Sequence, residues 1–370
     1  MKLNILILEP YYTGSHKKWA DDIINHSDHT IELITMPGRF WKWRMEGSAI
    51  YLSEVMSSRK ELPHLVVCSS MLDLGFLKGL LSKEWHDIPF LYYMHENQLT
   101  YPVSKLDRDS NNQEKHYGFI NLKSCLVADA VLFNSQYHRK SFIAAAIELM
   151  TRLPDYKYNM LESTLLSKSD VIPLGIDFQL IESIKPALDH KSDLPVLLWN
   201  HRWEYDKRPD LFLNMCRNLA DKGIKFKIRF LGQNHENTPK HITEFYERFP
   251  SLFDYFGYAE SYEEYIQLIK GSHILPVSSE HDFLGISVIE ALFCGLQPVL
   301  PEKMVYQEHL PAGFDYCFYH GQDQFIEKTR NALLTLSLYD YTAVNQHLRK
   351  KYNISDIVAC YDRYFKKKGA

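Results

Sequence analysis

The sequence has few cysteines, and their spacing does not indicate that any two of them form a pair. The six lie far apart, at Cys68, Cys125, Cys216, Cys294, Cys317 and Cys360, with no CxxC pair among them. In a chain of 370 residues this scatter excludes a disulfide scaffold and favours reduced, mostly buried thiols. We therefore expect a cytoplasmic protein.

Long hydrophobic runs and an excess of one charge are also absent. No apolar run approaches the ~18 residues of a membrane-spanning helix, so we expect no membrane insertion. The first apolar segment ends at Glu9, too early for the core of a signal peptide. The 42 Lys and Arg stand against 46 Asp and Glu, which gives a net charge of −4 and excludes a generic polyanion binder. Any contact with nucleic acid must then use a local patch.

Common nucleotide and metal motifs are missing as well. There is no GxGxxG and no GxxxxGK followed by Ser or Thr, which argues against a dehydrogenase and a P-loop enzyme. The histidines show no HxxxH spacing and form no cluster with cysteines. We expect no catalytic metal and no cofactor.

Aromatic residues, in contrast, are plentiful. The chain has 24 Tyr, 20 Phe and 6 Trp, or 14% of its residues. Large aromatic side chains pack cores, but they also line sugar and base pockets. The hydrophobic fraction of 45% and the charged fraction of 24% are typical of a globular protein, and the length predicts two or three domains.

Short apolar runs alternate with helical patterns through the first half of the chain. Strands are predicted at Leu3–Leu8, Thr30–Thr35, His64–Cys68, Phe90–Met94, Ala130–Asn134 and Asp170–Pro173. Helices are predicted at His16–Asn25, Ser48–Arg59, Glu114–Ala128 and Ser135–Met150. This alternation predicts right-handed βαβ units and a parallel sheet.

The same pattern restarts at residue 195. Strands are predicted at Pro195–Asn200, Lys225–Leu231, Leu252–Phe256, Ile274–Pro276 and Gln297–Leu300, and helices at Pro209–Asp221, Tyr262–Lys270 and Ser287–Cys294. We predict an N-terminal domain over 1–183, a linker over 184–194, a second domain over 195–340, and C-terminal helices over 341–370 that pack back on the first domain. The fold class is α/β, with two facing, doubly wound, Rossmann-like domains and a central cleft.

Two loops at predicted strand ends could bind an anion. The loop at residues 9–16 follows the first strand, and its Gly14 and Ser15 open a helix whose free N–H groups can meet an anion, although a plain strand–helix turn has the same pattern. Arg202 and Lys207 follow the first strand of the second domain and can converge on a diphosphate. A solvated basic loop is the alternative.

The segment 278–292 is the most informative one. A short apolar strand leads into Asp282 and Gly285, and then into an apolar helix that carries Glu290. A carboxylate among buried neighbours must be hydrogen-bonded or shift its pKa, and ribose hydroxyls are suitable donors. The backbone N–H groups of Leu284–Ile286 would suit a sugar hydroxyl or a phosphate oxygen.

These motifs resemble the retaining glycosyltransferases of the GT-B fold. The resemblance rests on Gly14, on Arg202 with Lys207, on Asp282 and Glu290 eight positions apart, and on the Pro-x-Gly-Ile-Asp segment 173–177. It implies a nucleotide-sugar donor held by Gly14, Ser15, Arg202, Lys207, Gly232, Asp282, Leu284, Gly285, Ile286 and Glu290. In that pattern the first acid is usually Glu, and this chain has Asp282.

Two longer motifs resemble a narrower group, which includes the tRNA-queuosine mannosyltransferases. They span residues 36–45, MPGRFWKWRM, and 94–102, MHENQLTYP. This resemblance implies GDP-mannose as the donor and the queuosine nucleoside of a tRNA as the acceptor. Alternatives are another nucleotide sugar, or a lipid, polysaccharide or small-molecule acceptor on the same fold. A non-catalytic RNA- or nucleotide-binding module is the third possibility.

Acceptor candidates lie in these two motifs. Arg39, Trp41, Lys42, Trp43 and Arg44 combine cations for phosphates with flat rings for splayed bases, whereas a packed aromatic core with exposed cations has the same composition. His95, Asn97, Gln98 and Tyr101 follow a strand and can hydrogen-bond hydroxyl groups. The resemblance implies that His95 contacts the donor hexose, unless it bonds only backbone.

The resemblance also implies a mechanism, front-face transfer without a protein nucleophile. Arg202 and Lys207 would stabilise the charge that grows on the leaving diphosphate, which is commonly a large catalytic contribution. Glu290 would hold the ribose, and Asp282 would hold the hexose together with the turn at Gly285. With His95, these four residues are the predicted catalytic set.

Overall fold

The computed structural model describes residues 2–102, 114–155, 158–186, 193–232, 239–336 and 339–369. It divides into two compact units: unit 1 is Met1–Gly175 with Ile354–Ala370, and unit 2 is Ile176–Asn353. This division falls eight residues before the predicted boundary at 183/184 and assigns residues 342–352 to unit 2. Of the predicted linker at 184–194, residues 187–192 lie outside the described residues.

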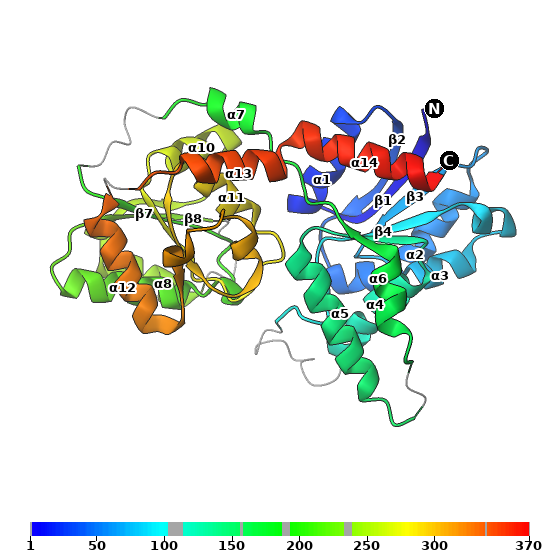
Figure 1. Ribbon diagram of the computed structural model, residues 1–370, viewed down its shortest axis with the longest axis horizontal. Helices are drawn as coiled ribbons and strands as arrows, with labels where there is room; N and C mark the ends of the chain where they lie inside the picture. The colour runs from blue at the N-terminus through cyan, green and yellow to red at the C-terminus, as the bar shows by residue number, and fades with distance from the viewer. Residues whose placement is uncertain are drawn as a thin grey trace. The chain divides into compact units, whose positions relative to one another are not determined.

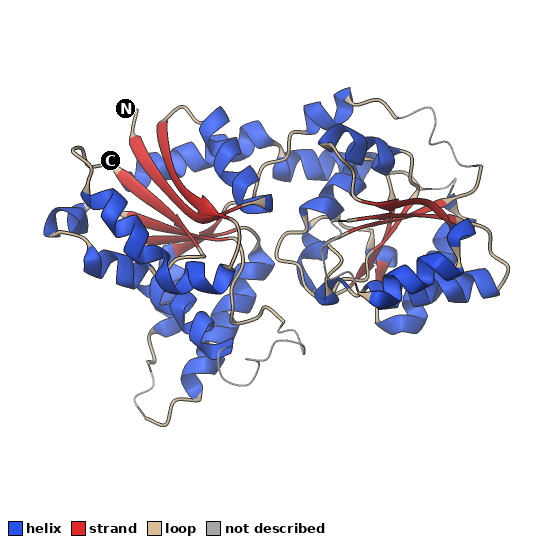
Figure 2. Cartoon of the chain, turned by 180° about the vertical axis from the view of Figure 1, so that it is seen from behind, coloured by secondary structure: helices blue, strands red, loops and turns tan. Residues whose placement is uncertain are grey.

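Unit 1 contains a six-stranded parallel sheet within its described residues. Its strands are β1 (Asn4–Tyr12), β2 (Thr30–Pro37), β3 (Leu65–Ser69), β4 (Phe90–Met94), β5 (Ala130–Phe133) and β6 (Ser169–Val171), in the order β2-β1-β3-β4-β5-β6. Its helices are α1 (Gly14–His26), α2 (Trp41–Ser57), α3 (Leu74–Leu80), α4 (Glu114–Val127), α5 (Gln136–Thr151), α6 (Leu161–Lys168) and α14 (Ile354–Gly369). Helices cover both faces of this sheet (Figures 1 and 2).

Burial on both faces explains why these strands read as continuous apolar runs. Leu6 and Leu8 of β1 join the core under α2–α6, while Ile5 and Ile7 are equally buried on the opposite face. In this unit, the structure has a strand at each position where the sequence predicted one. The predicted helix at Ser48–Arg59 was wrong at its start, because α2 begins at Trp41 after a left-handed Phe40 (φ 57°) instead of a capping side chain.

Unit 2 repeats the architecture in its described residues. Its strands are β7 (Val196–Asn200), β8 (Lys227–Leu231), β9 (Phe253–Gly257), β10 (Ile274–Pro276), β11 (Gln297–Pro301) and β12 (Phe318–Tyr319), in the order β12-β11-β10-β7-β8-β9. Its helices are α7 (Phe178–Ser183), α8 (Pro209–Asp221), α9 (Lys240–Arg248), α10 (Tyr262–Lys270), α11 (Ile286–Phe293), α12 (Gly321–Leu334) and α13 (Thr342–Tyr352).

Part of the aromatic excess packs the core of unit 2. The rings of Trp199 and Phe230, on neighbouring strands, stack with centroids 4.2 Å apart and nearly parallel planes. Trp203 and Phe256 extend this stack toward the carboxyl ends of β7 and β9. Stacked and edge-on aromatic pairs add stabilisation beyond the area that they bury. The two doubly wound, parallel α/β domains predicted from the sequence are confirmed.

The last helix of the chain packs on unit 1. In α14 the Tyr361 hydroxyl accepts a hydrogen bond from the Trp19 ring N–H of α1 at 3.1 Å, and α14 lies beside α1 (Figure 1). The buried Asp362 carboxylate accepts hydrogen bonds from the Ser27 hydroxyl at 2.6 Å and the Asp28 backbone N–H at 2.9 Å. These contacts fix the C-terminal helix to the segment between α1 and β2.

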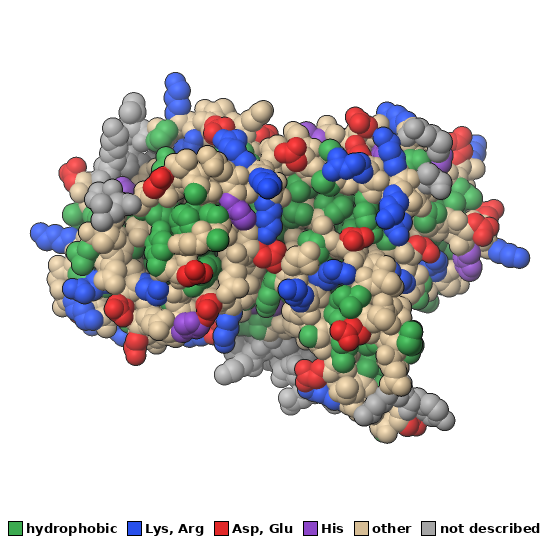
Figure 3. All heavy atoms as spheres, in the orientation of Figure 1, with side chains coloured by type: hydrophobic (Ala, Val, Ile, Leu, Met, Phe, Trp, Pro, Cys, Tyr) green, Lys and Arg blue, Asp and Glu red, His purple; other side chains and the backbone are tan. Residues whose placement is uncertain are grey.

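Surface and composition agree with the expectations from the sequence. Cations and acids are interspersed on the face shown in Figure 3, as the net charge of −4 suggests. All six cysteines are free. Within the described residues, no helix combines the length and the apolar content that crossing a bilayer requires.

Replacing Asp362 with Ala should lower the free energy of unfolding by about 2 kcal/mol, because two donors lose a charged acceptor. Urea unfolding followed by circular dichroism measures the change. Lys366→Ala, at an exposed position of the same helix, is the control and should have little effect. An Asp362→Ala variant as stable as the wild type would show that these two bonds do not hold α14.

Candidate active site

In unit 2, candidate donor residues gather where the strand order reverses. The chain runs from β7 outward through β8 and β9, and then returns to place β10 on the other side of β7. At such a reversal the crossovers leave in opposite directions, and the carboxyl ends of the two central strands stay open to a ligand. The segments that follow β7 and β10 carry Lys207 and Asp282 respectively.

Lys207 lies at the centre of a buried polar cluster. Its ammonium group donates to Asp282 Oδ1 at 2.9 Å and to the His281 carbonyl at 2.6 Å, and it lies 3.0 Å from Asp206 Oδ2. Two of the three donors of the ammonium group are thus used in hydrogen bonds, and the contact with Asp206 is an ion pair. The other Asp282 oxygen accepts a short hydrogen bond from the Tyr306 hydroxyl. The structure thus joins Lys207 and Asp282, which are 75 positions apart.

The cluster keeps its charges despite burial. Burial alone would raise the pKa of Asp282, but Lys207 and His201 hold it at about 2. Burial opposes the charge on Lys207 too, yet Asp282 and Asp206 raise its pKa above the usual value. Burial lowers the pKa of His201 to about 4, so its imidazole is neutral at pH 7. The cluster therefore holds one cation, Lys207, beside two carboxylates, Asp206 and Asp282.

Helix α11 begins beside this cluster. Gly285 adopts a left-handed conformation (φ 68°) just before the helix, and its carbonyl accepts hydrogen bonds from the N–H groups of Val288 at 3.0 Å and Ile289 at 3.1 Å. The N–H groups that precede Val288 lie in the first turn, where a helix offers no internal acceptor, so the role predicted for Leu284–Ile286 stays a prediction. Glu290 is buried, as predicted, and accepts a hydrogen bond from the Tyr262 hydroxyl at 2.9 Å.

Arg202 and Gly232 complete the predicted donor residues of unit 2. The Arg202 side chain is 55% exposed and lies 3.2 Å from Glu204. Gly232 (φ 155°) follows β8 in close contact with the β7 loop, because a Cβ there would lie 2.2 Å from the His201 carbonyl oxygen. The loop after β7 thus depends on a glycine in the loop after β8.

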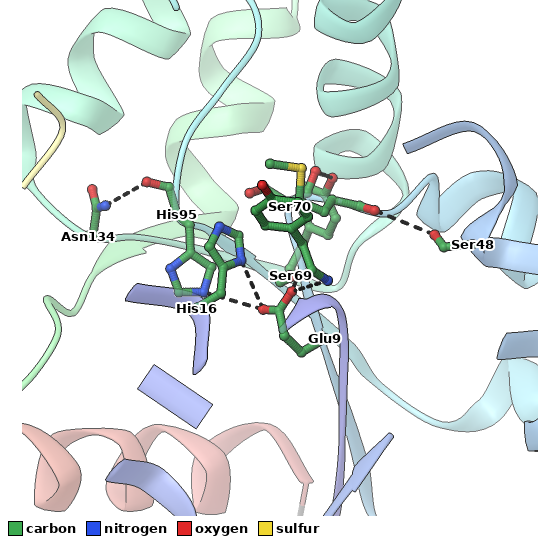
Figure 4. Close-up of polar contacts among 10 residues, drawn as sticks. Glu9, His16, Ser48, Ser69, Ser70, His95 and Asn134 are labelled. Atoms are coloured by element: carbon green, nitrogen blue, oxygen red, sulfur yellow. Dashed lines mark hydrogen bonds and ion pairs between the residues drawn. The ribbon is translucent and has the colours of Figure 1, made fainter. Parts of the chain in front are cut away.

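In unit 1, a second polar cluster lies at the corresponding reversal, between β1 and β3 (Figure 4). Glu9 is fully buried, and its Oε1 accepts hydrogen bonds from the Tyr11 N–H and the Ser69 hydroxyl, both at 2.9 Å. Its Oε2 lies 3.1 Å from His16 Nδ1 and 3.7 Å from His95 Nε2. Residues from β1, from the ends of β3 and β4 and from the start of α1 thus meet at one carboxylate.

His95 is the predicted site residue in this cluster. It is buried, and burial, with His16 and His138 nearby, lowers its pKa well below the usual value. Among the described residues, Glu9, His16 and His95 are the group whose ligand atoms, all within 4.8 Å of one another, could hold a cation. Because these three residues lie far apart in the sequence, on different strands and helices, the sequence did not predict that they come together.

The other predicted residues of unit 1 near this cluster have mixed environments. Gly14 (φ 50°) and Ser15 are exposed at the start of α1, with open space beside Gly14. Asn97 is fully buried, and its Oδ1 accepts hydrogen bonds from the backbone N–H groups of residues 99 and 100. Gln98 donates to Glu96, and Tyr101 is half-buried. Asn97 therefore shapes the loop.

The aromatic and basic motif divides between packing and exposure. Trp41 packs against Tyr117 with centroids 5.1 Å apart, whereas Trp43 is 74% exposed. Arg39 lies over the exposed Phe40 ring, and the Lys42 ammonium lies 5.8 Å from the Trp41 ring. Arg44 donates to the Pro37 carbonyl at 3.2 Å. Phe40 and Trp43 are thus the rings in this motif that are open to a partner.

Comparison with known proteins identifies the family. Residues 4–176 match the family model described as tRNA-queuosine alpha-mannosyltransferase N-terminal, and residues 181–336 match glycosyl transferases group 1. A tRNA-queuosine alpha-mannosyltransferase of Drosophila melanogaster is 32% identical over 359 residues, which cover 95% of this chain and 90% of the relative. The chain belongs to the tRNA-queuosine alpha-mannosyltransferase family. It is a hexosyltransferase, as the motifs predicted.

Solved structures agree with this assignment at the level of the fold. A glycosyltransferase from Rickettsia africae superposes with a TM-score of 0.69 at 14% identity, over 99% of this chain and 98% of that one. Anabaena HepE, in complex with UDP and glucose, superposes with a TM-score of 0.65 at 14% identity, over 98% and 99% of the two chains. The predicted GT-B fold class is confirmed.

Several residues of this family member were not found from its sequence. Glu9, His16 and Ser69 form the unit 1 cluster, and Asp206 and Tyr306 complete the contacts of Lys207 and Asp282. Glu9 gives one usable signal, since it is an acid that directly follows the apolar run of β1. Tyr306 gives none, because a short 3₁₀ helix after β11 positions it.

The depressed pKa of Asp282 predicts a pH-dependent contribution to stability. The carboxyl group has a pKa of about 2 in the folded chain against 3.8 unfolded, so its contribution of about 2.5 kcal/mol is complete above pH 5 and is lost as the pH falls through about 2. An Asp282→Asn variant lacks it. Urea unfolding at a series of pH values should show the difference in unfolding free energy shrinking below pH 4. A pH-independent difference would contradict the ion pair.

Proposed function

We propose that this chain transfers mannose from GDP-mannose to the queuosine nucleoside of a tRNA, with retention of configuration and without a catalytic metal, in the cytoplasm. Membership of the family, with its named Drosophila member, supports the acceptor and the sugar. The structural observation that carries the donor half is the charged cluster of Lys207 and Asp282 at the strand reversal of unit 2. The free cysteines fit a reducing compartment.

In this proposal, unit 2 holds the donor. The N–H groups at the start of α11 meet phosphate or hydroxyl oxygens, and Glu290, already hydrogen-bonded by Tyr262, accepts from the ribose. Lys207 reaches a phosphate oxygen by exchanging one of its internal contacts. Asp282, whose oxygens bond Lys207 and Tyr306, orients Lys207 in addition to its predicted contact with the hexose.

The exposed Arg202 stabilises the leaving group. As the bond from the sugar carbon to the diphosphate oxygen breaks, negative charge grows on the diphosphate, and a guanidinium can bind two of its oxygens at once. The acceptor hydroxyl forms the new bond to the same carbon and passes its proton to a phosphate oxygen of the leaving group. No protein nucleophile is needed, so retention follows from attack on the face that the diphosphate leaves.

On the acceptor side, the exposed rings of Phe40 and Trp43 stack on unpaired bases, and Arg39 and Lys42 contact phosphates. Arg44 holds the turn through its bond to Pro37. Because the footprint is small and the chain carries a net charge of −4, tRNA affinity should be modest and should fall with added salt.

The acceptor is tested with paired tRNAs. Purified protein incubated with labelled GDP-mannose should label tRNA that contains queuosine and leave the same tRNA without queuosine unlabelled, equally well in the presence of a chelator. Replacing GDP-mannose with UDP-glucose tests the donor. Equal labelling of both tRNAs refutes queuosine as the target, and donor hydrolysis without tRNA labelling would indicate another acceptor.

Arg202→Ala should lower kcat/KM for transfer by at least about 100-fold, the cost of losing ~3 kcal/mol of transition-state stabilisation. Its side chain is 55% exposed, so the free energy of unfolding should hardly change. Arg217→Ala, which removes an exposed cation from α8 of the same unit, is the matched control and should keep full activity. Wild-type transfer by Arg202→Ala would remove Arg202 from the mechanism.

A further inference from the structure

A carboxylate that has no Lys or Arg ion-pair partner among the described residues is buried at the strand reversal of unit 1. Glu9 is fully buried, and the ion pairs of the described residues give it two imidazoles but no Lys or Arg. Its other donors, the Tyr11 N–H and the Ser69 hydroxyl, are neutral. A buried charge with weak compensation costs stability, and a neutral amide of the same shape would cost less. The burial of Glu9 among these partners therefore calls for a functional explanation.

The ring of His95 faces this carboxylate and is packed among other rings. His16 stacks on one side of it at 4.0 Å between centroids, and the edges of Trp19 and Tyr93 enclose it at 5.0 and 4.7 Å. Asn134 donates to the His95 carbonyl at 2.8 Å, which fixes the backbone after β4 (Figure 4). Packing sets the plane of the ring, and Nε2 is the nitrogen on the side of Glu9, so the question that remains is which nitrogen carries the proton.

The position of Glu9 decides that question. His95 Nε2 is buried, makes no hydrogen bond, and lies 3.7 Å from Glu9 Oε2. A proton on Nε2 directs a positive N–H edge toward the carboxylate, whereas a lone pair there would be repelled by it. His16 Nδ1, closer at 3.1 Å, makes the direct hydrogen bond to the same oxygen.

We propose that Glu9 is a positioning residue that keeps the proton of the neutral His95 on Nε2, so that Nδ1 presents a lone pair to a hydroxyl group of the sugar or of its acceptor. This inference rests on the proposed function for the identity of that hydroxyl. The acid acts through His95 and touches no substrate, since it is fully enclosed by protein. His16 and Ser69 hold the carboxylate in place for this task.

The tautomer can be observed directly. Protein labelled with ¹⁵N-histidine gives two-bond nitrogen–hydrogen correlations, and the signals of His95 are those missing from His95→Gln. We expect the Nε2–H form in the wild type, and a loss of that preference in Glu9→Gln. An Nδ1–H form in the wild type, an unchanged tautomer in Glu9→Gln, or a stoichiometric metal ion bound at Glu9, His16 and His95 would each overturn the proposal.

Activity and stability should then change in opposite directions. Glu9→Gln should lower kcat for transfer to tRNA by about 10- to 100-fold, as removal of an outer partner commonly does, while its unfolding free energy stays equal or rises. Binding of GDP, which lacks the hexose, should not change. Ser69→Ala removes one hydrogen bond but keeps the charge, and should lower kcat by less than about threefold.

The two claims fail in different ways. If wild-type protein does not label queuosine-containing tRNA, the proposed function is wrong, and the nitrogen correlations still decide the role of Glu9. If the wild type labels that tRNA and Glu9→Gln does so equally fast, the proposed function stands and the positioning role is wrong. A Glu9→Gln variant that loses stability and activity together would indicate a purely structural acid.

Discussion

In a parallel sheet, the point where the strand order reverses leaves the ends of two neighbouring strands uncovered by crossover helices. Both candidate sites of this chain lie at such a point. In unit 1 the reversal falls between β1 and β3, and in unit 2 between β7 and β10. The crossover helices diverge there, so the loops at these strand ends are the ones that can meet a ligand without disturbing the core. Strands buried on both faces keep these loops in register.

The two reversals carry opposite electrostatic arrangements. In unit 2 a buried lysine is held by two aspartates, a carbonyl and, through Asp282, a tyrosine, so its charge is fixed in position before any phosphate arrives. In unit 1 a buried glutamate faces two stacked imidazoles and no Lys or Arg among the described residues. In the proposed function, the first site binds the anionic donor and the second meets neutral hydroxyl groups. Preorganised charge of this kind is how transferases lower barriers without a nucleophile.

Much of the fold followed from the sequence, because doubly buried strands and amphipathic helices have local signatures. Phe90–Met94, Pro209–Asp221 and Tyr262–Lys270 have the predicted bounds. The start of α2 was missed, since Phe40 replaces the usual capping side chain. Glu9 was missed because its partners lie 7, 60 and 86 positions away and only the sheet brings them together. Lys207 and Asp282 were each predicted as site residues, but their pairing was not, and the exposure of Arg202 has no sequence signal.

The central claim is that the nucleotide sugar binds at the strand reversal of unit 2, and hydrogen exchange tests it most directly. Backbone exchange would be measured by mass spectrometry with and without saturating GDP-mannose. The account predicts slower exchange in segments 200–208 and 278–290, which follow β7 and β10. Protection confined to the groove between α8 and α12, near Lys222 and Arg330, with those two segments unchanged, would contradict it.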